Sequence, residues 1–169
     1  KEWYEGRGIP WRMGSLLYGI WGSGKSFTIK TMCQLLDLPL FVFDLASLSN
    51  KELIEKWQEC QNFSPCAVLF EDIDSIWDGR ENKNKSEHYS SLTFDCFINK
   101  LSGVDGIKNK FIFITTNHKE QLDSALLRPG RIDEHYELKS LNKEEQTKMA
   151  SIILDSKQDL VDNVVNEGI

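Results

Sequence analysis

The chain has 169 residues, of which 40% are hydrophobic, and a formal net charge of −6. This length suits one domain with part of a second, and the apolar fraction is enough to bury a core. The acidic balance and the absence of a basic cluster argue against nucleic acid as the main partner, because nucleic-acid backbones are bound by clustered Lys and Arg.

A phosphate-binding loop is the first motif along the chain. Residues 19–26 fit the pattern G-x-x-x-x-G-K-[ST], in which glycines let several backbone N–H groups point at one phosphate chain. An apolar run at 15–18, predicted to be a strand, precedes the loop, and a predicted helix at 27–36 follows it. We expect Lys25 to reach the terminal phosphates and the Ser26 hydroxyl to bind Mg²⁺. The predicted nucleotide-binding residues are Gly19, Ile20, Trp21, Gly22, Ser23, Gly24, Lys25, Ser26 and Phe27.

Strands and helices are predicted to alternate along the rest of the chain. The remaining apolar strands are expected at 40–45, 66–70, 111–115 and 133–138, and helices at 50–61, 92–101, 121–127 and 142–154. Capping patterns at Ser49 and Asn142, each with Glu three residues later, mark two of the helix starts. Residues 78–91 are polar and predict an exposed loop, and the tail from Asp155 has few anchoring residues.

This alternation predicts an α/β fold, in which helices cover both faces of a parallel sheet. We expect a three-layer α/β/α sandwich around a five-stranded parallel sheet. Ligands of such sheets bind beyond the carboxyl ends of the strands. The phosphate loop, the pair Glu71-Asp72 and Asn117 each follow a predicted strand, so we expect them to meet at one edge.

Two further elements at this edge carry polar side chains suited to hydrolysis of a phosphate bond. The apolar run 66–70 delivers Glu71 and Asp72, of which one carboxylate is expected to hold Mg²⁺ and the next to orient or deprotonate water. Asp74 follows and could support the strand end. Asn117 closes the run 111–116, where its amide could contact the γ-phosphate or the water.

Together these motifs resemble an AAA ATPase of the AAA+ superfamily. The stretch 122–133, Leu-Asp-Ser-Ala-Leu-Leu-Arg-Pro-Gly-Arg-Ile-Asp, is similar to that family's second region of homology nearly residue for residue. The resemblance implies ATP and Mg²⁺ as cofactors and hydrolysis of ATP to ADP and phosphate. It also implies that Arg128 and Arg131 project into the neighbouring subunit's site as arginine fingers, which can be worth roughly 10³–10⁵ in rate.

A narrower match is similar to the subfamily of the mitochondrial inner-membrane translocase that extrudes folded Rieske iron–sulfur protein. Most AAA members end the second strand motif with Asp-Glu, whereas this chain has Glu71-Asp72, as that subfamily does. This order implies that Glu71 holds Mg²⁺ and that Asp72 prepares the water. The match covers about residues 4–140 and is carried by residues 7–10, 16–19, 69–74, 91–94 and 115–118.

The chain departs from the family pattern at three places. Ile20-Trp21 replaces the usual Pro-Pro, so the Trp21 side chain must point away from the phosphates. Asp72 is one methylene, about 1.5 Å, shorter than Glu, which favours slow turnover. Residues 46–50 lack the aromatic–aliphatic–Gly pore loop of unfoldase relatives, which puts threading of unfolded polypeptide in doubt.

The resemblance also implies a domain organisation and partners. Residues 1–140 are expected to form the large α/β subdomain and residues 141–169 the beginning of an α-helical lid. A homo-oligomeric ring of six or seven subunits and a protein substrate are the implied partners, with no strong sign of nucleic acid.

Three functional readings follow from the sequence. The first is an oligomeric ATPase that remodels or translocates a protein. The second is a slow nucleotide switch whose ATP-bound assembly is the signal, motivated by Asp72 and the missing pore aromatic. The third, a small-molecule kinase or GTPase, is disfavoured because the guanine motif Asn-Lys-x-Asp is absent and a monomeric kinase has no use for residues 122–133.

The cysteines bear on the compartment. The four cysteines are scattered without a C-x-x-C pair, and the three histidines complete no zinc pattern. We therefore expect reduced thiols in a cytoplasmic or matrix-like compartment. The sequence contains no signal peptide and no apolar run near the roughly 20 residues of a membrane span, so an anchor is expected only in an upstream segment.

Overall fold

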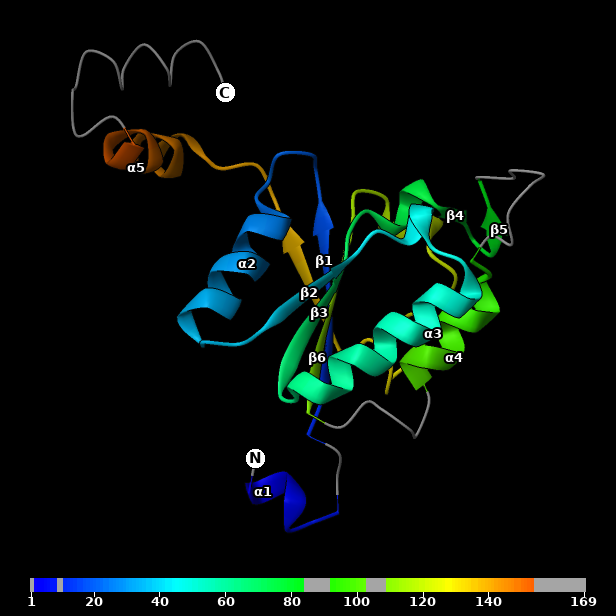
Figure 1. Cartoon of the computed structure of the whole chain (residues 1–169). Helices are drawn as coiled ribbons and strands as arrows, with labels where there is room; N and C mark the ends of the chain where they lie inside the picture. The colour runs from blue at the N-terminus through cyan, green and yellow to red at the C-terminus, as the bar shows by residue number, and fades with distance from the viewer. Residues whose placement is uncertain (1, 9–10, 84–91, 103–108, 154–169) are drawn as a thin grey trace. The chain divides into compact units, whose positions relative to one another are not determined.

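The computed structural model describes residues 2–8, 11–83, 92–102 and 109–153 of the chain (Figure 1). The chain consists of two compact units, Lys1–Leu138 and Lys139–Ile169. The first unit contains the sheet and every residue predicted to bind or hydrolyse nucleotide. The assignment of the second unit as a lid stays a prediction.

Five parallel strands form the central sheet of the first unit, which confirms the predicted three-layer α/β architecture. Their spatial order is β2-β3-β6-β1-β7, so the strand that carries the phosphate loop lies between β6 and β7. The connections between parallel neighbours are crossovers rather than tight hairpins. The strands are β1 (Met13–Gly19), β2 (Leu40–Phe43), β3 (Cys66–Phe70), β6 (Lys110–Thr116) and β7 (Glu134–Leu138).

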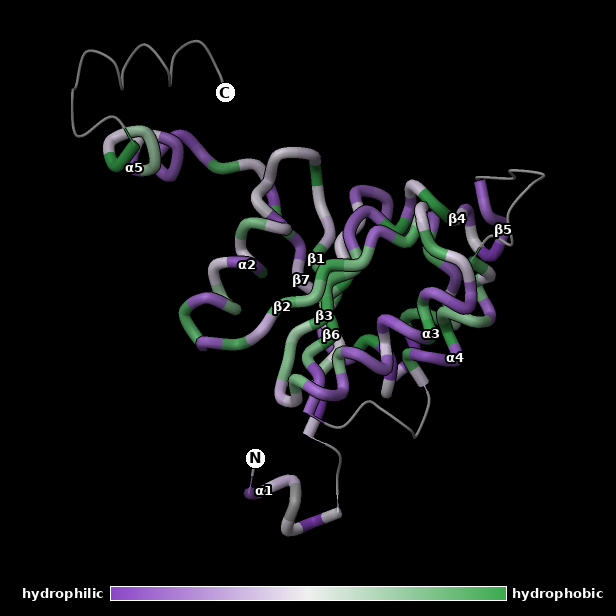
Figure 2. Tube along the Cα trace, viewed as in Figure 1, coloured by the Kyte–Doolittle hydropathy of each residue, from purple (hydrophilic) through white to green (hydrophobic). Residues whose placement is uncertain are grey.

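The strand β3 is buried on both faces, as its uninterrupted apolar sequence predicts. Cys66, Val68 and Phe70 join the larger hydrophobic core. Ala67 and Leu69 face the smaller core on the opposite side of the sheet. All five residues are fully buried, and their alternation follows the two-residue period of a strand. The green central strands in Figure 2 show the same concentration of hydrophobic residues.

Helices cover both faces of this sheet (Figure 1). The helix α2 (Lys25–Leu35) packs over β1 and β6 on one face, and α3 (Asn50–Glu59) and α4 (Phe94–Ser102) lie together on the other. Ser49 caps α3 with the predicted capping box, in which its side chain and that of Glu52 each bond the other's backbone N–H. The predicted apolar face of α4 is buried, and consists of Phe94, Phe97, Ile98 and Leu101.

Two local predictions were wrong. The segment predicted as a loop begins with a two-stranded antiparallel sheet of β4 (Trp77–Asp78) and β5 (Glu81–Asn82), while residues 84–91 lie outside the described part. The helix predicted at 121–127 is absent. A short 3₁₀ helix, η4 (Lys119–Gln121), is followed by turns in which the Asp123 carboxylate accepts from the Ala125 N–H. Such a side-chain bond competes with helical pairing.

Short elements complete the first unit. The N-terminal α1 (Glu2–Glu5) is a single turn. Three more 3₁₀ turns are η1 (Leu45–Ser47), η2 (Cys60–Phe63) and η3 (Ile73–Ser75). The predicted ends of two elements moved, since β2 ends at Phe43 and α3 ends at Glu59, each followed by one of these turns.

The second unit is described by one helix, α5 (Lys143–Ile153). Asn142 and Glu145 form the predicted cap, with each side chain accepting from the other residue's backbone N–H at 2.9 Å. The tail predicted from Asp155 lies outside the described residues.

The thiols of all four cysteines are free, and three of them are buried. Within the described ranges, no helix combines the length and the apolar character that crossing a bilayer requires.

Candidate functional site

The phosphate loop connects β1 to α2 and leaves the start of that helix open to an anion. Gly24 occupies the N-cap position with φ 86°, a left-handed conformation that glycine adopts without steric cost. No side chain caps the helix, and its first turn contains no acidic residue. The first-turn N–H groups have no acceptor within the helix and carry the positive end of its dipole. This arrangement suits bound phosphate.

Lys25 is the best-connected side chain of the site. Its Nζ donates to the carbonyl oxygens of Gly19 at 3.0 Å and Ile20 at 2.8 Å, and to Asn117 Oδ1 at 2.7 Å. The residue is only 7% exposed. Burial lowers the pKa of Lys25 below its usual value of 10.5, and the nearby carboxylates of Asp72 and Asp74 oppose that decrease. The ammonium group of Lys25 is therefore held by the end of β1 and the start of the phosphate loop on one side, and by Asn117 after β6 on the other.

The two adjacent carboxylates after β3 have different surroundings. Glu71 lies 3.7 Å from Lys30 Nζ on α2, with about a third of its side chain exposed. Asp72 has left-handed backbone angles, φ 45° and ψ 55°, and its N–H donates to Thr115 Oγ1 at 3.0 Å. The two carboxylates have different partners, Lys30 for Glu71 and Asn117 for Asp72, so they are suited to different tasks.

Asn117 joins the phosphate loop to the Asp72 carboxylate. Its Oδ1 accepts from Lys25, and its Nδ2 donates to Asp72 Oδ1 at 3.5 Å. The structure thus brings together Lys25, Asp72 and Asn117, from three different segments, as the convergence argument predicted. The catalytic roles assigned to these residues stay predictions.

The loop residues fit a nucleotide phosphate chain. Ser23 Oγ, in the middle of the loop, is a buried hydroxyl without a hydrogen-bond partner among the described residues. A buried polar atom of this kind is costly unless a ligand supplies its partner. Ser26 lies in the first turn of α2 and is half-buried.

The oxygen donors available for a metal are few. Ser26 and Glu71 are the residues that would hold Mg²⁺, and both supply the oxygen ligands that this ion prefers. In the described ranges, no group of three or more His, Cys, Asp and Glu side chains forms a metal cage. This pattern is compatible with an ion that keeps waters and shares the substrate's phosphates. The metal-binding role of both residues stays a prediction.

The apolar side chains of the loop point outward. The Trp21 side chain is 75% exposed, and its ring meets that of His118 edge-on at 5.9 Å between centroids. Ile20 and Phe27 are also exposed. The loop therefore accommodates bulky residues at the Pro-Pro positions. Ile20 contributes to holding Lys25 through its backbone carbonyl, and its side chain is not needed for that contact.

The two candidate arginine fingers differ in their surroundings. Arg131 donates to the Ser102 hydroxyl of α4 and to the carbonyl of Ala125, so its guanidinium is held within its own subunit. Arg128 is exposed, and its guanidinium forms no hydrogen bond or ion pair with the described residues, although its backbone carbonyl accepts from the N–H groups of Arg131 and Ile132. No hydrogen bond joins the side chain of either arginine to Lys25 or Asn117. The finger role of both stays a prediction, and Arg128 has the geometry better suited to it.

Strand β1 anchors this arginine segment. Asp133 Oδ2 accepts from the Gly14 N–H at 3.0 Å, and the Asp133 N–H returns to the Gly14 carbonyl at 2.7 Å. A Cβ at Gly14 would lie 1.8 Å from the Arg131 carbonyl oxygen, so only glycine permits this approach. The arginine segment and the phosphate loop are thus attached to the same strand.

Sequence reasoning missed two side chains of the site. Lys30, one helical turn after Ser26, pairs with Glu71, and the Thr115 hydroxyl orients Asp72. The only sequence signal for the second was the polar pair Thr115-Thr116 at the end of an apolar strand.

Known proteins match most of this unit. The profile of the ATPase family associated with various cellular activities (AAA) matches residues 15–140. The "Probable mitochondrial chaperone bcs1" of Schizosaccharomyces pombe is 42% identical over 136 residues, which cover 79% of this chain and 30% of that protein. The human "Mitochondrial chaperone BCS1" is 39% identical over 138 residues, covering 78% and 32%. The chain therefore spans about a third of the length of these relatives.

Proposed function

This chain belongs to the AAA family of ATPases, and we propose that it binds ATP and hydrolyses it as one subunit of an oligomeric ring. The contact set of Lys25, Asn117 and Asp72 carries the proposal. It places a cation for the phosphates, an amide and a carboxylate within one hydrogen-bonded group at the mouth of a phosphate loop.

The residues divide the work as follows. The α2 N-terminus and Lys25 bind the phosphates, and Ser26 and Glu71 hold Mg²⁺, which when bound neutralises phosphate charge. To hold the ion, Glu71 would have to give up its contact with Lys30. Asp72 accepts a proton from, or orients, the attacking water, and Asn117 contacts the γ-phosphate or the water.

A protein substrate completes the proposal. The two relatives compared above are named chaperones, and we extend a chaperone-like remodelling or translocation of protein to this chain. The residues 46–50 contain no aromatic, so cargo is not gripped by the pore-loop pattern of unfoldases. The substrate is therefore moved in a folded or partly folded form. We place the protein in a cytoplasmic or matrix-like reducing compartment, which the free buried thiols favour.

A second candidate is a slow nucleotide switch. The short Asp72 side chain, fixed by a left-handed backbone, limits how far its carboxylate can reach toward water. A misplacement of about 1 Å can cost on the order of 100-fold in rate. As a switch, the protein would act by assembling when ATP is bound, and not by repeated hydrolysis.

One experiment separates these readings. ATP hydrolysis per protomer is measured over a wide range of protein concentration, with Lys25→Ala as the blank. A rate per protomer that rises steeply with concentration supports sites completed by neighbouring subunits. A flat and appreciable rate contradicts the ring with fingers in trans. Bound ATP with turnover no higher than the blank at every concentration favours the switch.

A further inference from the structure

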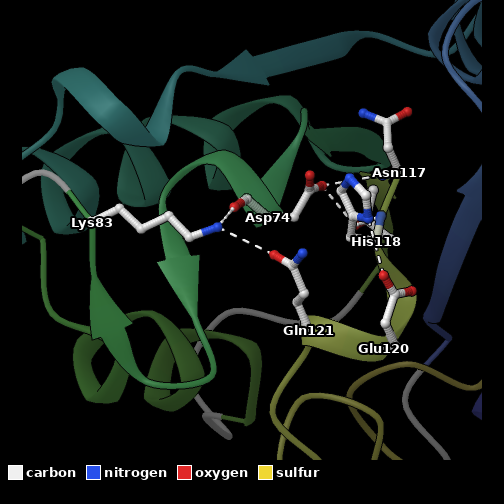
Figure 3. A network of polar contacts seen from close by, with 7 residues as sticks. Asp74, Lys83, Asn117, His118, Glu120 and Gln121 are labelled. Atoms are coloured by element: carbon white, nitrogen blue, oxygen red, sulfur yellow. Dashed lines mark hydrogen bonds and ion pairs between the residues drawn. The ribbon is translucent and has the colours of Figure 1, made fainter.

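We propose that Asp74 is a positioning residue for hydrolysis, which acts by fixing Asn117 against Lys25 and Asp72. The inference rests on the proposed function, because it assigns a residue to that same site. Asp74 does not touch the phosphate loop in the structure. Its carboxylate contacts the end of β6 and the residue that follows, through the Thr116 hydroxyl and the Asn117 backbone N–H (Figure 3).

The first step of the argument is the contact made by the Asp74 carboxylate. Oδ1 accepts from the Thr116 hydroxyl at 2.6 Å and from the Asn117 backbone N–H at 3.1 Å. The Thr116 oxygen in turn accepts from the His118 N–H at 3.0 Å. Two consecutive residues therefore bond one carboxylate oxygen, and a third is joined to it through the Thr116 hydroxyl. Asp74 is 7% exposed and Thr116 is fully buried, so these ionic hydrogen bonds are shielded from water.

The second step is that the backbone of Asp74 is held as well. Lys83 Nζ donates to the Asp74 carbonyl at 2.7 Å and to Gln121 Oε1 at 3.2 Å (Figure 3). The Ser75 N–H closes the 3₁₀ turn η3 by donating to the Asp72 carbonyl at 2.9 Å. Asp74 is thus fixed relative to Asp72 by backbone geometry, and relative to the turn after β6 by its side chain.

The third step is that Asn117 has a task that demands a fixed orientation. Lys25 offers only donors and Asp72 only acceptors, so the amide must present its oxygen to one and its NH₂ to the other. A turn that rotates freely would break this match. The Asp74 bonds to the backbone around Asn117 restrict that rotation, which is why a carboxylate at this position serves catalysis and not only folding.

The test is a double-mutant cycle in the full-length protein. Asp74→Ala, Asn117→Ala and the double variant are compared for kcat of ATP hydrolysis and for Kd of a fluorescent ATP analogue. We expect Asp74→Ala to lower kcat by about 100-fold and to leave Kd nearly unchanged, because the amide is misplaced and the phosphate loop is intact. In the Asn117→Ala background, Asp74→Ala should change kcat by less than about twofold.

Two further variants guard against a folding defect. Asp74→Asn keeps an oxygen acceptor without the charge, and should recover part of the lost kcat. Ile98→Val removes a methylene from the buried face of α4, which supplies none of the contacts of Asp74, and should lower the melting temperature without changing kcat. If Asp74→Ala lowers kcat no more than a core variant of equal melting temperature does, the role is structural and the inference is wrong.

The outcomes also separate this inference from the proposed function. Wild-type turnover no higher than that of Lys25→Ala overturns the proposed function and this inference with it. Normal wild-type turnover, with Asp74→Ala and Asn117→Ala multiplying their losses in the double variant, overturns only the inference. A loss in the double variant equal to that of Asn117→Ala alone supports both.

Discussion

The backbone at Asp72 gives a physical reason for the unusual order of the two carboxylates. With φ 45° and ψ 55° the residue is left-handed, a conformation that Asp and Asn adopt more readily than Glu, because a short polar side chain can bond locally. Glu at this position would reach about 1.5 Å farther but would strain the turn. The left-handed backbone therefore favours Asp over Glu at position 72.

This turn decides how Asp72 should be tested. Asp72→Asn tolerates the same backbone angles while removing the base, so it should lower kcat by about 100-fold or more and leave ATP affinity and melting temperature nearly unchanged. Steady-state hydrolysis, ATP-analogue binding and thermal unfolding measure the three quantities. Asp72→Ala is the poorer variant, because Ala is strained at positive φ. Near-normal kcat in Asp72→Asn would mean that another group prepares the water.

Cys60 predicts a specific effect of alkaline pH on stability. Burial raises the pKa of its thiol from 9.0 to about 12, and Cys66 adds to the increase while Lys110 opposes it. Between these values the folded state keeps a proton that the unfolded state loses, so the stabilisation is complete below pH 9 and falls as pH rises toward 12. The free energy of unfolding should drop by about 1.4 kcal/mol per pH unit from this thiol.

Cys60→Ala isolates that contribution. Urea unfolding is measured between pH 8 and pH 11 under reducing conditions for the wild type and the variant. The variant should lose less stability per pH unit, whatever its stability at pH 8, because the other buried thiols and Lys110 are common to both proteins. Equal slopes would show that Cys60 titrates normally.

At the scale of elements, the sequence succeeded where local chemistry and burial agree. The capping residues of α3 and α5 and the apolar face of α4 were read correctly from spacing alone. The prediction of a helix at 121–127 was wrong because the Asp123 carboxylate binds a residue distant in the sequence. Arg80 Nε binds its carboxylate at 2.8 Å, and the Ala125 N–H takes the other oxygen. A contact over such a distance along the chain leaves no periodic signal.

The cap of α3 gives a stability prediction for an element that supplies none of the catalytic contacts. Ser49 accepts from the Glu52 N–H, and Glu52 accepts from both the hydroxyl and the N–H of Ser49. Ser49→Ala should therefore lower the free energy of unfolding by about 1 kcal/mol and leave kcat unchanged. Chemical denaturation measures the first, with Ser49→Thr as the matched variant that retains a capping hydroxyl. Equal stability of Ala and Thr variants would contradict a role for the cap.

For the molecule as a whole, the meeting of the phosphate loop, Asp72 and Asn117 was predictable because parallel strands present their carboxyl ends at one edge. The individual side-chain contacts of the site could not be predicted from the sequence. The pairing of Leu17 with Thr115 and of Phe70 with Ile114 fixes how far β1 and β3 extend along β6, and therefore whether Thr115 can reach Asp72. That register depends on packing of the complete sheet. The partner of Glu71 depends likewise on how α2 lies over it.

The exposed guanidinium of Arg128 leads to a prediction that tests the proposed ring. If Arg128 completes the neighbour's site, Arg128→Ala and Asp72→Asn impair different halves of one interface. Each variant alone should be inactive, but mixed rings should regain activity, since in a random equal mixture about one interface in four combines an intact site with an intact arginine. Hydrolysis is measured after mixing, with mixed assembly verified by native mass spectrometry. Lys25→Ala mixed with Asp72→Asn is the matched control and should stay inactive, because both changes damage the same half of the interface. Mixed rings of Arg128→Ala and Asp72→Asn without recovered activity would show that Arg128 does not act between subunits.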